Sequence, residues 1–388
     1  MLLNRLHHIC FVKASHFSSS VVPSTNWEKL IKEIGLIYER CKKYEAGEVA
    51  TYIPQLRNAD PKLWAISLMT IDGKTASWGE SKQKFCLQSV SKPFTYAIAL
   101  NDLGDDYVHR FVGQEPSGRN FNDICLDKNK KPHNPMINSG SIVVTSMIKP
   151  EWTNYKRFAF ILERMRCFAS GNELTFDNTT FLSECETGHQ NYAIAHYLKQ
   201  NNCYPTNDDL SNDDLMELLK LYFMHCSIQT DTEVLANMAA TLANGGIEPI
   251  NQGTVISMKA VQNTLSVMFS CGMYDNSGQM AFKVGLPAKS GVSGNMILVI
   301  PNVMGISLYS PRLDVYGNTV RGVKFAEQLI DTFRFHLMSA GHHRCSLCSS
   351  RGEYVDCLRS SFSIRHSYLY SPGQEICVHS LNVLSPFS

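Results

Sequence analysis

The sequence lacks an excess of charge of either sign, and it lacks a long hydrophobic run. Lys and Arg number 36 and Asp and Glu number 35 among 388 residues, so the formal net charge is +1. We therefore expect no basic surface for nucleic acid or for an anionic membrane. The longest apolar run, around residues 296–309, contains Pro301, Asn302 and Gly305 and is too short to span a bilayer. The hydrophobic fraction of 44% nevertheless supports a substantial core.

A regular disulfide framework is also missing. Thirteen cysteines are an odd number, and they are scattered along the chain. This usage favours reduced thiols in an intracellular protein. One close pair, Cys345 and Cys348, follows His342 and His343 and would suit zinc, but a second ligand pair at proper spacing is missing. We therefore favour a poorly ordered Cys- and Ser-rich tail over residues 339–388.

The N-terminus lacks acidic residues, since the first one is Glu28. An acid-poor, serine-containing start is typical of an organellar transit peptide, whereas a single arginine and a short apolar face fit a disordered start equally well. Both interpretations of residues 1–25 stay open. The main domain is expected over residues 26–338.

Helical and strand patterns alternate along this main domain in an uneven way. Residues 25–28 read as a capping box, residues 52–56 as a loop, and residues 63–71 with Asp72-Gly73 as a strand and hairpin turn. Helices are expected at 89–100, 192–199, 215–223, 233–244 and 325–338, and further strands at 296–300 and 305–310. Strands at both ends of a mostly helical sequence predict an α+β fold. Its mixed or antiparallel sheet would be flanked by helices, with a helical subdomain inserted.

Ser89 and Lys92 form a Ser-x-x-Lys motif just before Pro93. Residues i and i+3 share one face of a helix, and proline is tolerated in the first turn. A neutral Lys92 would then be able to take the proton of the Ser89 hydroxyl. Taken alone the motif is weak, because a capped helix with a solvated lysine explains it as well. A later Lys289-Ser290-Gly291 before a strand matches the second motif of serine β-lactamases and penicillin-binding proteins.

Longer blocks in one order resemble the glutaminase family of animals and bacteria. The matching segments extend from about Ile34 to about Met338 and are residues 86–93, 131–140, 183–191, 221–228, 239–246, 270–275, 284–292 and 301–305. The resemblance implies a serine β-lactamase-like fold. It also implies hydrolysis of L-glutamine to L-glutamate and ammonia through a glutamyl ester of Ser89.

The same resemblance implies the roles of the site residues. Ser89 would be the nucleophile and Lys92 its base, while Tyr274 relays protons and Tyr52 contacts the substrate or the nucleophile. The backbone N–H groups of Ser89 and Val292 would hold the oxyanion. Substrate recognition would use one carboxylate for the α-ammonium group and neutral donors and acceptors for the α-carboxylate: Glu184, then Asn138, Asn191 and Tyr222. A lone Glu or Asn on a loop is usually solvated surface, so these assignments depend on the matched blocks.

Regulation and assembly are expected on the same basis. Residues 112–121 resemble the gating loop that couples inorganic phosphate to the site in the animal enzymes, although a plain surface turn explains them too. No cofactor is expected beyond phosphate as an activator. The resemblance further implies a homo-oligomer, a dimer of dimers that stacks into longer assemblies or filaments, located in mitochondria or otherwise in the cytoplasm.

Three departures from the family pattern are visible. His189-Gln190 replaces an Asp-Arg pair, and loss of the guanidinium is expected to loosen the loop or weaken substrate binding. Gly294-Asn295 replaces a glycine pair, a mild change because Asn tolerates positive φ. Residues 339–388 stand where the animal members carry ankyrin repeats.

Two other functions remain open at this stage. One is a catalytically weakened homologue with a structural role in filaments, suggested by His189, Gln190 and the unusual tail. The other is a β-lactamase- or transpeptidase-like acyltransferase with the same Ser–Lys pair. The absence of an evident signal peptide argues against the acyltransferase.

Overall fold

The computed structural model describes residues 24–118, 124–333 and 335–339. The predictions for residues 1–23, for the tail beyond residue 339 and for the pair Cys345 and Cys348 lie outside the described residues.

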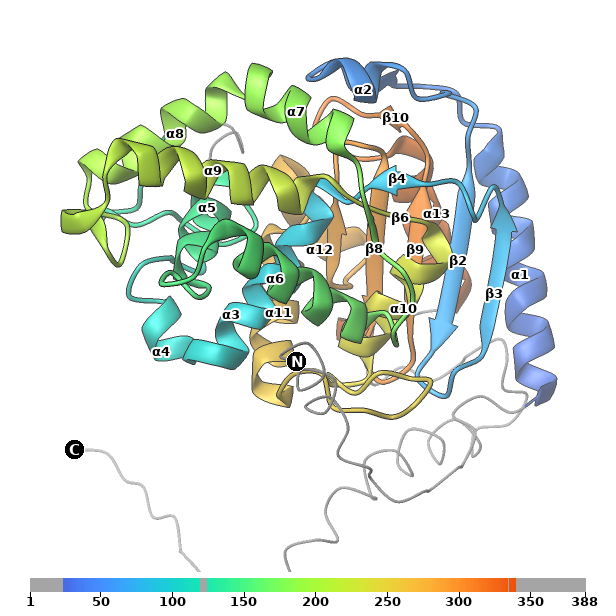
Figure 1. Cartoon of the computed structure of the whole chain (residues 1–388). Coiled ribbons are helices and arrows are strands. Elements are labelled where there is room, and N and C mark those ends of the chain that lie inside the picture. The colour runs from blue at the N-terminus through green and yellow to red at the C-terminus, as the bar shows by residue number, and fades with distance from the viewer. Residues whose placement is uncertain (1–23, 119–123, 334, 340–388) are drawn as a thin grey trace, which may run out of the picture. The chain divides into compact units, whose positions relative to one another are not determined.

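A five-stranded antiparallel sheet forms the centre of the described chain, in the order β3-β2-β9-β8-β7. Its strands are β2 (Ala65–Thr70), β3 (Thr75–Gly79), β7 (Ala288–Ser290), β8 (Asn295–Ile300) and β9 (Met304–Tyr309). The predicted hairpin is confirmed, and its strand β2 pairs with β9 so that Ile66 lies opposite Leu308. Segments from both ends of the chain therefore lie side by side in one sheet (Figure 1).

Two helices cover one face of the sheet, α1 (Ser24–Lys42) and α13 (Val320–Phe333). Leu30, Ile34 and Ile37 of α1 pack into one core with the side chains that alternate along β8, Met296, Leu298 and Ile300. The capping-box prediction begins this helix one residue late. The predicted helix 325–338 is wrong at both ends, because the buried apolar spacing of α13 starts at Val323 and ends at Phe333.

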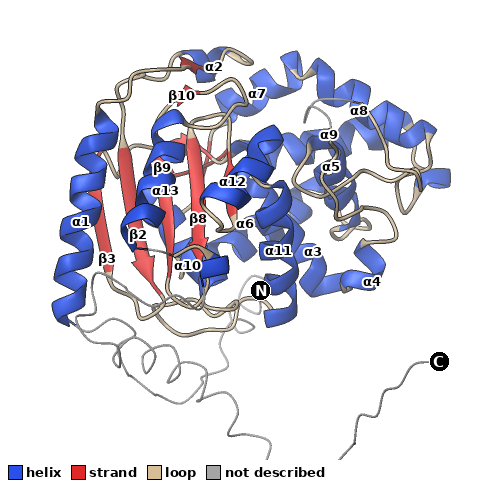
Figure 2. Ribbon diagram, turned by 180° about the vertical axis from the view of Figure 1, so that it is seen from behind, coloured by secondary structure: helices blue, strands red, loops and turns tan. Residues whose placement is uncertain are grey.

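The opposite face carries α10 (Thr232–Ala243), which packs across β2, β8 and β9. A Cβ added to Gly305 of β9 would lie 2.2 Å from the backbone nitrogen of Ala240, so only glycine permits this close approach. A helical subdomain lies beside the sheet (Figure 2), and its core continues into α10 and the side chains of Ile297 and Val299 of β8. It consists of α3 (Ser91–Leu103), α5 (Asn138–Met147), α6 (Asn154–Phe168), α7 (Asn178–Thr187), α8 (His189–Gln200), α9 (Asn212–Cys226) and α11 (Met258–Cys271).

Small elements connect the two regions. A three-stranded sheet of β4 (Phe85–Cys86), β6 (Ile228–Thr230) and β5 (Thr175–Phe176) joins the subdomain to the segment before Ser89. The remaining short elements are β1 (Glu48–Val49), β10 (Arg312–Leu313), α2 (Pro54–Arg57), α4 (Asp105–Val108) and α12 (Ser277–Lys283). Helix α2 corrects the predicted loop at 52–56, since Pro54 stands at the first helical position, where proline starts helices well.

The observed architecture confirms the predicted α+β class with an antiparallel sheet, flanking helices and an inserted helical subdomain. Among the described residues, no helix is both long and apolar enough to cross a membrane.

Candidate active site

Ser89 lies in a 3-10 turn, Gln88–Val90, directly before α3. The predicted helix from Ser89 therefore begins two residues later as an α-helix, because Gln88 adopts a positive φ of 47° and turns the chain. The turn leaves the expected side-chain pair intact. Lys92 Nζ donates a hydrogen bond to Ser89 Oγ at 2.7 Å. The alternative of a solvated lysine is wrong, since Lys92 is only 2% exposed.

Burial controls the charge of Lys92. Desolvation lowers its pKa to about 8, against smaller opposing effects of Cys226 and Glu184. Within the described part of the chain no carboxylate forms an ion pair with this amine. Its Nζ lies over the ring of Tyr222, 5.5 Å from the centroid. A useful fraction of Lys92 is thus neutral near physiological pH and able to accept the Ser89 proton.

A second buried lysine, Lys289 of β7, is close enough to Lys92 to interact with its charge. Its Nζ donates to Ser290 O at 2.7 Å and lies 4.5 Å from the centroid of the Tyr274 ring. Burial, and then the charge of Lys92, holds the pKa of Lys289 well below its usual value. The sequence analysis identified the Lys289-Ser290-Gly291 motif, but it gave no role to this amine.

Tyr274 and Lys289 both donate a hydrogen bond to the carbonyl of Ser290. Its hydroxyl donates to Ser290 O at 3.1 Å, and burial raises its pKa far more than a hydrogen bond with Ser89 lowers it. The phenol is therefore neutral. The approach of its segment to β7 requires Gly272, where a Cβ would lie 1.8 Å from Ala288 O.

Val292 lies in the turn between β7 and β8, and β7 packs beside the Ser89 turn. The turn is closed by Gly291 N–H to Asn295 O and Gly294 N–H to Gly291 O, each at 2.9 Å. Within the described residues, the Val292 N–H donates to no acceptor. It is thus a candidate donor for an oxyanion.

A buried carboxylate faces the nucleophile from the helical subdomain. Glu184 of α7 is 1% exposed and accepts hydrogen bonds from the Tyr52 hydroxyl and from Gln88 Nε2, the latter at 3.0 Å. Burial raises the pKa of Glu184, while these two bonds and Lys92 oppose the rise. The Tyr52 side chain is 44% exposed as a whole, but its hydroxyl points inward to this carboxylate. Gln88 is a contact that the sequence analysis missed, and its position next to Ser89 was the available signal.

The two predicted asparagines form a short hydrogen-bond network that is connected to Glu184 through Tyr52. Asn138 at the start of α5 donates to Asn191 Oδ1 at 3.0 Å and accepts from the Tyr222 hydroxyl at 3.2 Å. Asn191 also hydrogen-bonds Tyr52, which closes the connection to Glu184. Contacts thus link eight of the predicted site residues into one continuous set: Ser89, Lys92, Tyr274, Tyr222, Asn138, Asn191, Tyr52 and Glu184. Val292 lies in the turn that follows β7, which packs beside the Ser89 turn.

The family departures lie differently from what we expected. His189 and Gln190 are exposed at the start of α8, whereas the adjacent Asn191 is buried and paired with Asn138. Loss of the guanidinium at position 190 therefore leaves that pairing in place. Asn295 does not need a tolerance of positive φ, because Gly294 has φ 94° while Asn295 begins strand β8.

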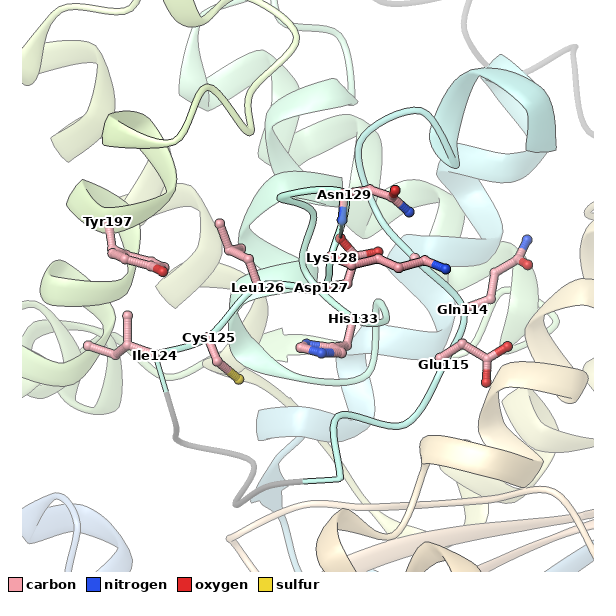
Figure 3. A pocket seen from close by; sticks show the side chains of 11 residues that line it. Gln114, Glu115, Ile124, Cys125, Leu126, Asp127, Lys128, Asn129, His133 and Tyr197 are labelled. Carbon is pink, nitrogen blue, oxygen red and sulfur yellow. Dashed lines mark hydrogen bonds between the residues drawn. The ribbon is translucent and has the colours of Figure 1, made fainter.

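An open pocket of about 690 Å³ lies apart from this site and shares no lining residue with it (Figure 3). Residues 113–115 of the predicted gating segment form part of its wall, together with the segment 124–129, His133 and Tyr197. Residues 119–121 of that segment fall outside the described residues. No group of three or more His, Cys, Asp or Glu residues able to hold a metal ion occurs in the described part of the chain.

The chain is similar in sequence to known proteins. The model of the family described as Glutaminase matches residues 47–338. A Caenorhabditis elegans protein that carries the glutaminase name is 55% identical over 80% of this chain and 52% of its own length. The mitochondrial liver isoform of glutaminase from Rattus norvegicus is 49% identical over 81% of this chain and 51% of its own length.

The fold is shared with solved structures as well. The crystal structure of Mglu in its glutamate form is 36% identical with a TM-score of 0.74, covering 80% of this chain and 70% of that chain. The chain spans about half the length of the two animal relatives named above.

Proposed function

The chain belongs to the glutaminase family, and from that premise we propose that it hydrolyses the side-chain amide of L-glutamine to L-glutamate and ammonia. The observation that carries the proposal is the 2.7 Å bond between Lys92 Nζ and Ser89 Oγ. Burial of that lysine, with no ion-pair partner among the residues that the structure describes, supports its use as a neutral base.

The reaction proceeds in two halves. Ser89 Oγ attacks the amide carbon while Lys92 Nζ takes its proton, and the backbone N–H groups of Ser89 and Val292 stabilise the oxyanion. The C–N bond breaks, the departing nitrogen receives the proton, and ammonia leaves a glutamyl ester on Ser89. Water then attacks the ester, Lys92 accepts a proton from it, and Ser89 is released with glutamate. The hydrogen bond between Tyr274 and Ser89 supports Tyr274 as the relay of that proton.

Recognition of free glutamine uses the residues around Glu184, which faces the nucleophile from the helical subdomain. Glu184 pairs with the α-ammonium group, and Tyr52 and Gln88 hold the carboxylate oriented for it. Asn138, Asn191 and Tyr222 bind the α-carboxylate with neutral groups. The glutamate form of the related Mglu structure supports an amino-acid ligand for this fold.

A coupled glutamate dehydrogenase assay on the purified full chain tests the proposal. We expect glutamate from glutamine, with and without phosphate, and far less turnover of asparagine. No glutamate under either condition would contradict the proposal and favour the weakened, filament-forming homologue. Labelling of Ser89 by a penicillin-type probe would favour the acyltransferase instead.

We propose a mitochondrial location, supported by the name of the rat relative and by the acid-poor start of the sequence. The alternative is the cytoplasm. Full-length protein tagged at its C-terminus would co-localise with mitochondria, and the same protein without residues 1–25 would not. Retention of the mitochondrial signal after that deletion would contradict a targeting role for the segment.

We also propose a homo-oligomer, a dimer of dimers that stacks into longer assemblies, in which residues 112–121 couple activation by inorganic phosphate to the active site. Within the described residues, Gly113 N–H donates to Pro132 O and Glu115 N–H donates to His133 O, so this segment is tied to the loop before α5. Light scattering with and without phosphate checks the assembly. A monomer at all concentrations would contradict it.

A further inference from the structure

Two carbonyl groups stand directly before the Ser89 turn, those of Cys86 and Leu87. Three side-chain hydrogen bonds from the distant turn after β7 and from the first residue of β8 converge on them. Ser293 Oγ donates to Cys86 O at 2.8 Å, and Asn295 Nδ2 donates to Cys86 O at 3.4 Å and to Leu87 O at 3.1 Å. Both donors are buried, Ser293 at 5% and Asn295 at 0% exposure. These contacts join segments more than 200 residues apart in the sequence.

The neighbouring backbone explains why side chains are needed here. Strand β4 pairs with β6 along one edge, and the Leu87 N–H continues that pairing to Ile228 O. The carbonyls of Cys86 and Leu87 meet the turn between β7 and β8, where no strand pairs with β4 in the described chain. Buried carbonyls require donors, and Ser293 and Asn295 supply them.

The orientation of the Asn295 amide is forced. Both of its partners are carbonyl oxygens, which accept only, so the nitrogen faces them and Oδ1 faces away. Oδ1 is left buried without a partner and lies against Gly291, where a Cβ would come within 2.1 Å of it. A buried acceptor without a donor costs free energy. We therefore attribute the presence of Asn295 to the two hydrogen bonds that its nitrogen makes.

We propose that Ser293 and Asn295 are positioning residues that clamp the oxyanion turn to the nucleophile segment; this deepens the proposed function and rests on it. Ser293 directly follows Val292, and Leu87 lies two residues before Ser89. The clamp therefore fixes the Val292 N–H relative to Ser89 Oγ. A backbone donor stabilises developing negative charge only if it is held at the position of the oxyanion. Relative movement of the two segments would therefore reduce stabilisation of the transition state more than it reduces substrate affinity.

The test compares Asn295→Gly, Ser293→Ala and the double variant with Ser307→Ala in the purified full chain. Ser307 is a suitable control because it is a buried serine of β9 whose hydroxyl has no partner within the described residues. Glycine at position 295 retains a backbone that the family pattern accepts. Ser293→Thr keeps the hydroxyl and should therefore retain the activity that Ser293→Ala loses.

We expect kcat of the double variant to fall about 10- to 100-fold with KM changed less than about threefold, since the lost interaction acts in the transition state. Each single variant should lose about three- to tenfold, while Ser307→Ala and Ser293→Thr stay near the parent. A folded double variant with parental kcat would overturn the proposal. So would a rise in KM alone.

Amide hydrogen exchange of residues 291–294 gives a second readout that does not depend on turnover. The clamp predicts faster exchange in the double variant than in Ser307→Ala. Unchanged exchange overturns the clamp even if the parent is active. If the parent releases no glutamate, the proposed function fails, but faster exchange in the double variant still supports the clamp.

Discussion

The two walls of the site bury ionisable groups to a similar degree, but they differ in the partners that they give to these groups. On one wall, which we call the amine wall, Lys92 and Lys289 have no carboxylate ion-pair partner in the described chain. On the other, the carboxylate wall, Glu184 accepts hydrogen bonds from Tyr52 and Gln88. The same desolvation lowers the pKa of both amines and raises that of the carboxyl group.

The difference shows how burial serves two purposes. An unpartnered amine is most stable when neutral, and a neutral amine is a base. A carboxylate that keeps two donors is oriented but still lacks a cation, and the α-ammonium group of the substrate supplies one. The amine wall is thus ready before substrate binds, whereas the carboxylate wall is completed by the substrate.

Breaking the amine wall should have the largest effect. Ser89→Ala removes the attacking oxygen, and Lys92→Met removes its base while filling a similar volume. We expect each to lower kcat at least about a thousandfold, with KM less affected. Glutamate release at saturating glutamine measures this, with thermal unfolding as the check on folding. Parental kcat in either folded variant would contradict the mechanism.

Breaking the carboxylate wall should act on binding. Glu184→Gln keeps the shape but leaves the α-ammonium group without a counter-charge in a buried site. We expect kcat/KM to fall about a hundredfold, mostly through KM, because an unpaired buried charge is costly. Tyr52→Phe, which leaves the carboxylate in place, is the milder control. A loss confined to kcat would show that Glu184 serves the chemistry instead.

The pH dependence separates the two walls further. Lys92 acts as a base only when neutral, and its pKa is about 8. We therefore expect kcat/KM to rise about ninefold between pH 6 and pH 7 and to level off above about pH 8. Glu184→Gln should keep the limb but move it towards lower pH, because the Glu184 charge raises the pKa of Lys92. A flat profile from pH 6 to pH 8 would contradict the assignment of Lys92.

The same titration affects stability. The pKa of Lys92 is lower in the folded chain than its ordinary value of 10.5, so the unfolded chain binds more protons between pH 8 and pH 10.5. Its contribution to stability therefore becomes more favourable as the pH rises through that window.

Lys289→Met probes the second amine with a smaller expected effect. It removes the donor that shares Ser290 O with Tyr274 and the contact with the tyrosine ring. We expect kcat to fall about tenfold. The acid limb should stay in place, because a neutral Lys289 adds no charge next to Lys92. Lys283→Met, on an exposed lysine paired with Glu327, is the control. A limb shifted by a full pH unit would show that Lys289 is charged in the resting enzyme.

The smallest effect should come from Gln190→Arg. The side chain at this position is exposed, and Asn191 already pairs with Asn138. We expect KM to change less than about twofold, within the range usual for surface substitutions. A tenfold fall in KM would show that the family arginine reaches the site after all.

Local spacing in the sequence placed Ser89 and Lys92 on one face of a helix, but a solvated lysine explained that spacing as well, and the later motif and the family resemblance decided for the pair. It was not enough for the contact between Tyr52 and Glu184, which lie 132 residues apart, and only the family resemblance suggested that they share a site. The role of Asn295 was missed because its importance depends on which carbonyls face it across the fold. The hairpin at Asp72-Gly73 was predictable, whereas the pairing of β2 with β9 depends on a register that no local pattern contains.

The strand order also has a consequence for biosynthesis. One edge of β2 is paired by β3 soon after it leaves the ribosome, but its other partner, β9, is encoded more than 200 residues later. At about 5 to 20 residues per second, that edge stays open for roughly ten seconds or longer. The nascent chain therefore displays an apolar, unpaired strand edge during most of its own translation, and such an edge is a template for pairing with other chains.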